Sequence, residues 1–170
     1  MGAVDFKTEV IGIRDTVGWL KKTEPEIFKE FRSKAKFAVD PIVKDAQARL
    51  NAASSRNGFA PLSGMVRPWG KKKGRVVPGW SQSTAVKGVK VQVRPSKTSF
   101  LTVTQRQIAP AVFDIAGRSN PNVLSRQLDL FATASRTMWP AAESKEDEVR
   151  KNLAELVDYV NDKTNKKLRF

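Results

Sequence analysis

The sequence predicts an α+β fold: a small antiparallel twisted sheet flanked by N-terminal helices and a long C-terminal helix, with an extended basic loop. Apolar residues recur at helical spacing in the first and last thirds of the chain, and they alternate with polar residues around 89–93. A stretch rich in Gly, Pro and Ser, residues 59–84, separates the two patterns and predicts a long loop or arm. The length of 170 residues indicates a single domain, 1–170.

Three helices are expected in the first third of the chain. The first carries apolar residues at helical spacing from Val10 to Leu20. The second begins at the stretch Thr23-Glu24-Pro25-Glu26, which has the form of a capping box with Pro in the first turn. The third begins at Asp40-Pro41, the same kind of start signal.

The sheet is expected to follow the loop. In residues 89–94 three valines alternate with Lys90, Gln92 and Arg94, which is the period of a half-buried strand with a basic outer face. A second strand is predicted through residues 99–108, and the apolar stretch 111–117 is expected to pair as a third.

The last third of the chain is predicted to be helical again. A short helix is expected within residues 123–131, where apolar residues return. Ser144 is expected to cap a long helix, because three acids stand in its first turn, where the helix dipole favours negative charge.

The positive charge of the chain is concentrated in its middle. Of the net charge of +14, residues 46–113 carry +12, because they hold 12 Lys and Arg and no Asp or Glu. Such a segment is typical of a surface that faces a polyanion or an acidic protein. The basic residues predicted to face DNA or a partner are Arg67, Lys71, Lys72, Lys73, Arg75, Lys87, Lys90, Arg94 and Lys97.

Two tryptophans flank the most basic part of the loop. Trp69 and Trp80 could stack on exposed bases of single strands. Tryptophan beside Pro or Gly in a loop is more typical of a local packing anchor, and we interpret both as loop anchors.

The composition argues against an enzyme. The chain has no Cys and no His, so it lacks a thiol nucleophile, the commonest general base and the commonest metal ligand. No catalytic residue, metal site, cofactor or small-molecule substrate is predicted. Asp114 stands in an apolar stretch with Arg118 four residues on, and we expect it to pair with arginine. No apolar run reaches the length of a membrane span, and the N-terminus lacks the apolar core of a signal peptide.

Residues 108–139 carry a resemblance to a known family. The stretch APAVFDIAGR, a spacer rich in Ser and Asn, and SRTMWPAAE ahead of a terminal helix resemble the tail-completion and head-to-tail connector (neck) proteins of long-tailed bacteriophages. The stretch PGWSQSTAVKGVKVQV is similar to the part of that family that leads into its first hairpin. The motif positions, which the resemblance also places at interfaces, are Phe113, Asp114, Ala116, Gly117, Arg118, Arg136, Trp139, Pro140 and Ala141.

The resemblance implies a non-enzymatic virion protein of the neck, a ring-forming subunit that joins head to tail around the DNA channel. It implies copies of the chain itself as partners, commonly six in a hexamer, with adjoining neck and tail-tube proteins and the genomic double-stranded DNA in the lumen. The protein would be made in the host cytoplasm and end in the virion. Two alternatives stay open: a sequence-independent double-stranded DNA-binding protein, and a tail terminator ring subunit of similar architecture.

Overall fold

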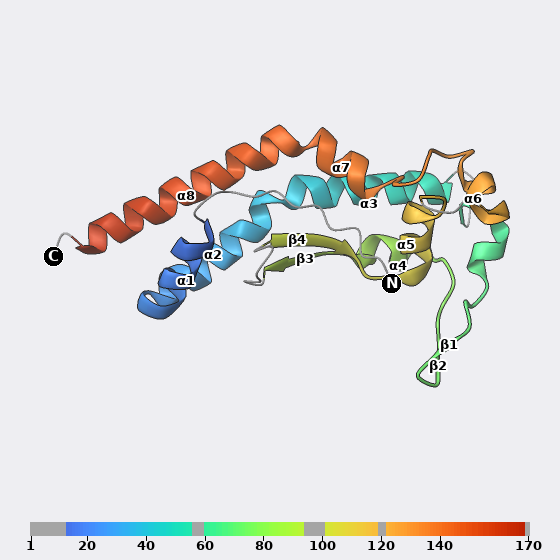
Figure 1. Ribbon diagram of the computed structural model, residues 1–170, viewed down its shortest axis with the longest axis horizontal. Helices are drawn as coiled ribbons and strands as arrows, with labels where there is room; N and C mark the ends of the chain where they lie inside the picture. Colours follow the sequence, from blue (N-terminus) through green and yellow to red (C-terminus); the bar gives the residue numbers. More distant parts are fainter. Residues whose placement is uncertain (1–12, 56–59, 94–100, 119–121, 169–170) are drawn as a thin grey trace.

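The computed structural model describes residues 13–55, 60–93, 101–118 and 122–168. Helices and strands are mixed in it, as predicted for an α+β protein, and a long helix closes the chain (Figure 1). The helices are α1 (Ile13–Thr23), α2 (Pro25–Ala38), α3 (Asp40–Ser55), α4 (Gln82–Gly88), α5 (Ile108–Ile115), α6 (Val123–Leu128), α7 (Met138–Ser144) and α8 (Glu146–Leu168), with a 3₁₀ turn η1 (Ser63–Val66).

Two antiparallel strand pairs accompany these helices. The strands β3 (Val89–Val93) and β4 (Leu101–Gln105) pair in the register Val91 with Val103. Their valine face is covered by α2 and α3, and Lys90 on the other face is exposed. The strands β1 (Lys71–Lys72) and β2 (Arg75–Val76) form a separate short hairpin.

The elements are arranged in layers. The helices α2 and α3 lie between the β3–β4 sheet and an outer layer formed by α7 and α8 (Figure 1). The core follows this order: Phe31 and Leu50 from the middle layer are buried, as are Val89 from the sheet and Leu153 from α8. The helix α3 packs against the sheet on one side and against α7 on the other. Small side chains such as Ala46, which is fully buried, let the layers approach each other closely.

Three local predictions are wrong. The stretch 111–117 forms most of α5 and no third strand, because the apolar run continues the helix from Ile108 and periodicity cannot distinguish short apolar elements. The capping box at Thr23 does not form: α1 includes Thr23, whose hydroxyl donates to the carbonyl of Trp19 at 2.8 Å. Ser144 ends α7 and does not cap α8, which begins at Glu146.

Other predictions fall on residues outside the description. Val10, Arg94, Lys97 and the turn at Pro95 all lie there, so the first helix is described only from Ile13. The long loop 59–84 is described from Ala60 and contains η1, the β1–β2 hairpin and the start of α4.

The far half of α8 is held to α2 by a polar contact. The hydroxyl of Tyr159 donates to Glu30, and Nζ of Lys163 donates to the same carboxylate at 2.7 Å. These two hydrogen bonds, that of Lys163 first, lower the pKa of Glu30 below its ordinary value of 4.5, and the bond to Glu30 raises the pKa of Lys163.

This contact predicts a pH dependence of stability. A carboxyl group whose pKa is lowered on folding stabilises the fold above its unfolded pKa, and that contribution is lost as pH falls through the folded value. We expect the wild-type protein to be more stable than Glu30→Gln at pH 7, and the difference to shrink as pH falls from about 4.5 downward. Urea unfolding of both proteins at several pH values measures it, and an equal difference at pH 7 and at the acid end would contradict it.

Candidate partner-binding site at the basic arm

The most basic part of the chain forms a projecting hairpin, here called the basic arm and defined as residues 67–79. It extends away from the layered body, near the end of the molecule where α6 lies (Figure 1). Its tip is a two-residue turn in which Lys73 and Gly74 both have positive φ, 50° and 76°. This is the backbone of the tight turns that match the twist of paired strands, and glycine makes the second position easy.

The base of the arm is tied to the core. Beyond the β1–β2 pairs, the amide of Val77 donates to the carbonyl of Gly70 at 2.8 Å, and the amide of Trp69 donates to the carbonyl of Val77 at 2.9 Å. The amide of Trp80 then donates to the carbonyl of Met65 at 2.7 Å. Gly79 lies so close to η1 that a Cβ atom there would meet the carbonyl oxygen of Val66 at 2.2 Å.

Both predicted anchors lie at this base. Trp80 is buried, packs edge-on against Phe113 with ring centroids 5.4 Å apart, and donates from its indole to the hydroxyl of Ser54 at 3.1 Å. Trp69 is half-buried and donates from its indole to the carbonyl of Met65 at 3.3 Å. Since both indoles are packed in this way, neither is arranged to stack on a base.

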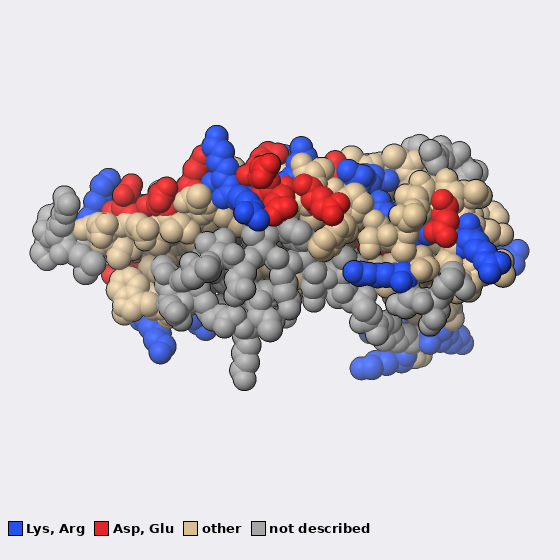
Figure 2. Space-filling model, turned by 45° about the horizontal axis from the view of Figure 1, so that its top comes forward, with Lys and Arg blue, Asp and Glu red and all other residues tan. Residues whose placement is uncertain are grey.

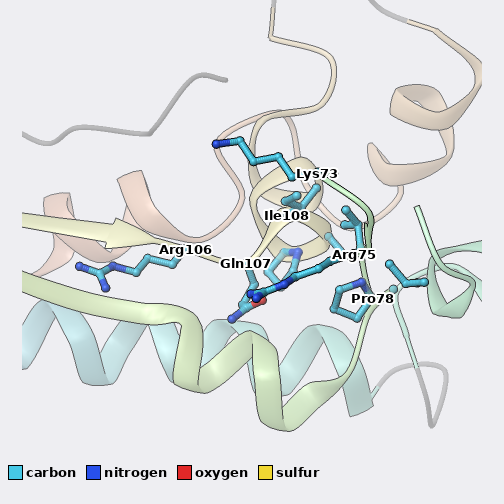
Figure 3. Close-up of a pocket in the computed structure, with 11 residues that line it drawn as sticks. Lys73, Arg75, Pro78, Arg106, Gln107 and Ile108 are labelled. Atoms are coloured by element: carbon cyan, nitrogen blue, oxygen red, sulfur yellow. The ribbon is translucent and has the colours of Figure 1, made fainter. Parts of the chain in front are cut away.

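A cleft opens between the arm and the start of α5. Its volume is about 560 Å³. Three cations line it, Lys73 and Arg75 from the arm and Arg106 from the segment after β4, together with Gln107 and apolar residues, and no acid is among its lining residues. Figure 3 shows Arg75 reaching across toward Gln107, while Arg106 extends along the sheet. The apolar floor is formed by Val76, Val77, Pro78, Ile108, Ala109 and Pro110.

The described cations of the arm, and those on α4, on β3 and directly after β4, have no partner within the described chain. The side chains of Arg67, Lys71, Lys73, Arg75, Lys87, Lys90 and Arg106 are exposed and have no hydrogen bond or ion pair with any described residue. In the longer helices some cations are paired, such as Lys44 with Asp40, Arg49 with Asp45 and Arg150 with Glu146, whereas others, such as Lys29, have no ion pair with a described residue. The positive charge of the arm is therefore not neutralised within the described chain.

The predicted basic set is only partly brought together. Lys73 and Arg75 share the cleft, whereas Arg67 lines a separate hollow at the other side of the base with Trp69 and Leu130. Lys87 lies on α4 and Lys90 on β3, outside the lining of the cleft. Arg106 was missing from the predicted set, although its place in the acid-free segment was a usable signal.

Several residues of the resemblance motifs meet in a buried hydrogen-bond network around Arg136 and Asp114, here called the Arg136 network. Arg136 is only 5% exposed, and its guanidinium donates to the carbonyls of Phe113 at 2.8 Å, Ala116 at 3.0 Å and Leu128 at 3.1 Å. It also pairs with Asp129 at 2.7 Å. Burial lowers the pKa of Arg136, and the charges of Asp129 and Asp114 oppose that effect.

Within the Arg136 network, Asp114 caps the N-terminal end of α7. Its Oδ1 accepts from the amide and the hydroxyl of Thr137, at 2.5 and 2.6 Å, and from the amide of Met138 at 3.1 Å. Oδ2 is buried without a hydrogen-bond partner in the described chain. The expected pairing with Arg118 is not present: Arg118 is exposed, and the arginine whose charge acts with Asp114 is Arg136.

The motif positions therefore do not form one interface. Phe113, Asp114 and Arg136 are buried inside the chain, so they hold the fold together and do not face a partner as expected. Gly117 has a φ of 95° and a Cβ there would meet Ser125 at 2.9 Å, which makes it a structural glycine. Trp139 is 40% exposed, and its indole donates to Glu143, while Pro140 is half-buried beside it in α7.

The described residues contain no group of three or more Asp and Glu placed to hold a metal ion. None of the helices of residues 13–55, 60–93, 101–118 and 122–168 combines the length and apolar character of a membrane span. Comparison of the chain with protein-family models, with curated proteins and with solved structures gives no match.

The Trp80 anchor predicts a stability difference. Trp80→Ala removes a buried indole and should lower the free energy of unfolding by about 3–5 kcal/mol, whereas Trp80→Phe keeps an aromatic ring and should lower it by about 1 kcal/mol. Trp69→Ala is the control and should cost less than Trp80→Ala, since Trp69 is half-buried. Urea unfolding measures all three, and a neutral Trp80→Ala would contradict the anchor.

The Arg136 network predicts an order of stability for variants of its two acids. Asp114→Ala leaves the amides of Thr137 and Met138 without their acceptor and removes a negative charge that acts on the buried Arg136, so it should cost about 3 kcal/mol or more. Asp114→Asn retains an acceptor oxygen and should cost less. Asp129→Asn serves as the control, because Asp129 is 46% exposed and should cost below about 1 kcal/mol. Thermal and urea unfolding of the three variants measure this order, which equal costs would contradict.

Proposed function

We propose that this chain is a structural virion protein of the phage neck, a ring-forming subunit that joins head to tail around the DNA channel. One observation supports it most: the projecting arm contains no acid, and its cations Arg67, Lys71, Lys73 and Arg75 have no ion pair with a described residue. The motif resemblance supplies the class of protein, and the arm supplies a surface suited to such a role.

The arm is better explained by an external partner than by the fold. Like charges gathered on one hairpin repel one another, and they add nothing to the core. Only the base of the arm is packed, through Trp80 and Gly79. A surface of this kind becomes favourable when negative charge from DNA or from a neighbouring protein is placed against it.

A second candidate is a sequence-independent double-stranded DNA-binding protein. The same unpaired cations favour it, because Lys and Arg displace condensed counterions from phosphates whatever the base sequence. A two-stranded ribbon also fits the major groove of a duplex. This function predicts tight binding of random duplex by the purified protein, with affinity falling steeply as salt rises, whereas the neck subunit predicts weak binding of free DNA.

The first experiment compares particles made with and without this protein. Negative-stain images should show separated heads and tails when it is missing, and rings in preparations of the purified protein. Joined, normal particles in its absence would reject the neck function. Tight, salt-sensitive binding of random duplex together with normal particles would favour the DNA-binding candidate.

The second experiment removes the charge of the arm. The triple variant Lys71→Gln/Lys73→Gln/Arg75→Gln should fold normally and lower the yield of joined particles at least tenfold, about 1.4 kcal/mol in an equilibrium. Counting joined particles in micrographs measures the yield.

A matched control removes three other charges from the helical body. Lys29, Lys36 and Arg126 are exposed and have no ion pair with a described residue, so Lys29→Gln/Lys36→Gln/Arg126→Gln makes the same change in net charge. This control should leave the yield unchanged. Equal yields from the two triple variants would remove the arm from the proposed function.

A further inference from the structure

We infer that the cleft beside the basic arm receives an acidic surface of α8 from a second copy of the chain. This inference rests on the proposed function, because a ring subunit must contact its own copies, and it deepens that proposal by naming the two surfaces that meet. They are the cleft lined by Lys73, Arg75 and Arg106, and an acidic stripe formed by Asp147, Glu155, Asp158 and Asp162.

The acidic stripe follows one outward face of α8. Its members are spaced eight, three and four residues apart along a 23-residue helix, so they lie within one sector of its surface, which also carries the exposed Lys151. The opposite face, with Val149, Leu153, Leu156 and Val160, is buried against the body. All four acids are exposed and none has a hydrogen bond or ion pair with a described residue. Figure 2 shows acidic side chains along this helix.

The cleft is the complement of this stripe in charge. Its three cations have no partner among the described residues, and no acid lines it. Apolar residues, among them Pro78 and Ile108, line the cleft beside the cations. A partner that covers the cleft would exclude water from this side, and ion pairs formed there would be stronger than pairs on an open surface.

The two surfaces lie apart on an elongated molecule. The helix α8 runs from near the middle of the molecule to one end of its long axis, and the basic arm is near the other end (Figure 1). Surfaces that differ and lie apart cannot satisfy each other within one copy. They join copies head to tail, and a head-to-tail contact closes into a ring when its rotation permits.

The shape of the cleft favours a protein segment over duplex DNA as its occupant. A volume of about 560 Å³ accommodates a few side chains, and a double helix is far too broad to enter it. Duplex phosphates would also leave the apolar floor uncovered. Binding of DNA by the outer side of the arm remains a separate matter, which the second candidate function tests.

Charge reversal on each surface tests this contact. Arg75→Glu/Arg106→Glu alters the cleft, and Glu155→Lys/Asp158→Lys alters the stripe. Each double variant should weaken self-association at least tenfold, measured as the dissociation constant by sedimentation at about 0.15 M salt, because like charges then face each other. Circular dichroism and the melting temperature should stay those of the wild type, since all four residues are exposed.

Combining the reversals separates this contact from a general effect of charge. The quadruple variant carries both changes in one chain, so its acidic cleft again faces a basic stripe, and its dissociation constant should return to within about threefold of the wild type. Mixing the two double variants should restore association in the same way. The control Lys29→Glu/Arg126→Glu, at exposed cations outside both surfaces, should leave association unchanged.

Three outcomes would overturn the inference: a wild type that stays monomeric at every concentration, double variants that associate like the wild type, or a quadruple variant that stays as weak as its parents. The proposed function is decided separately, by whether particles lacking the protein have separated heads and tails. Rings that persist in both double variants would keep the neck function and reject this interface.

Discussion

The buried guanidinium of Arg136 is the interaction on which the end of the molecule that carries the arm depends. It gathers the carbonyl groups that end α5 and α6, and Asp114 beside it begins α7. Short helices such as these have little stability of their own, because forming the first turn costs more than it returns. The guanidinium of Arg136 stabilises these short helices by donating hydrogen bonds to several of their terminal carbonyl groups at once. The longer helices α2 and α8 are stabilised instead by packing along their apolar faces.

The Arg136 network also fixes the position of the arm. Phe113, whose carbonyl accepts from Arg136, packs edge-on against both Trp80 and Phe131. Trp80 directly follows the base of the arm, so a chain of contacts runs from a buried charge to the projecting hairpin. The residues that carry the family resemblance are thus mostly those that hold this framework. These residues are buried within the chain, whereas the cations of the arm are exposed.

Long amphipathic elements could be predicted from the sequence, whereas short apolar elements and contacts between distant segments could not. The stripes of α2, α3 and α8 repeat over many residues, so the helical period is clear, and Val89–Val93 alternates cleanly as a strand. The run through Phe113 is short and apolar on every side, so helix and strand fit it equally. Arg106 joins the cleft through the antiparallel return of β4, a juxtaposition that no local pattern encodes.

The division of the arm into a packed base and a bare tip has a consequence for evolution. Residues between Gly70 and Val76 contribute only the hairpin pairs and the turn, while the core ends at Trp80. Substitutions at the tip therefore leave folding almost untouched, provided that the turn keeps its glycine. The charge and shape of the tip can therefore change through a few substitutions without loss of stability in the body.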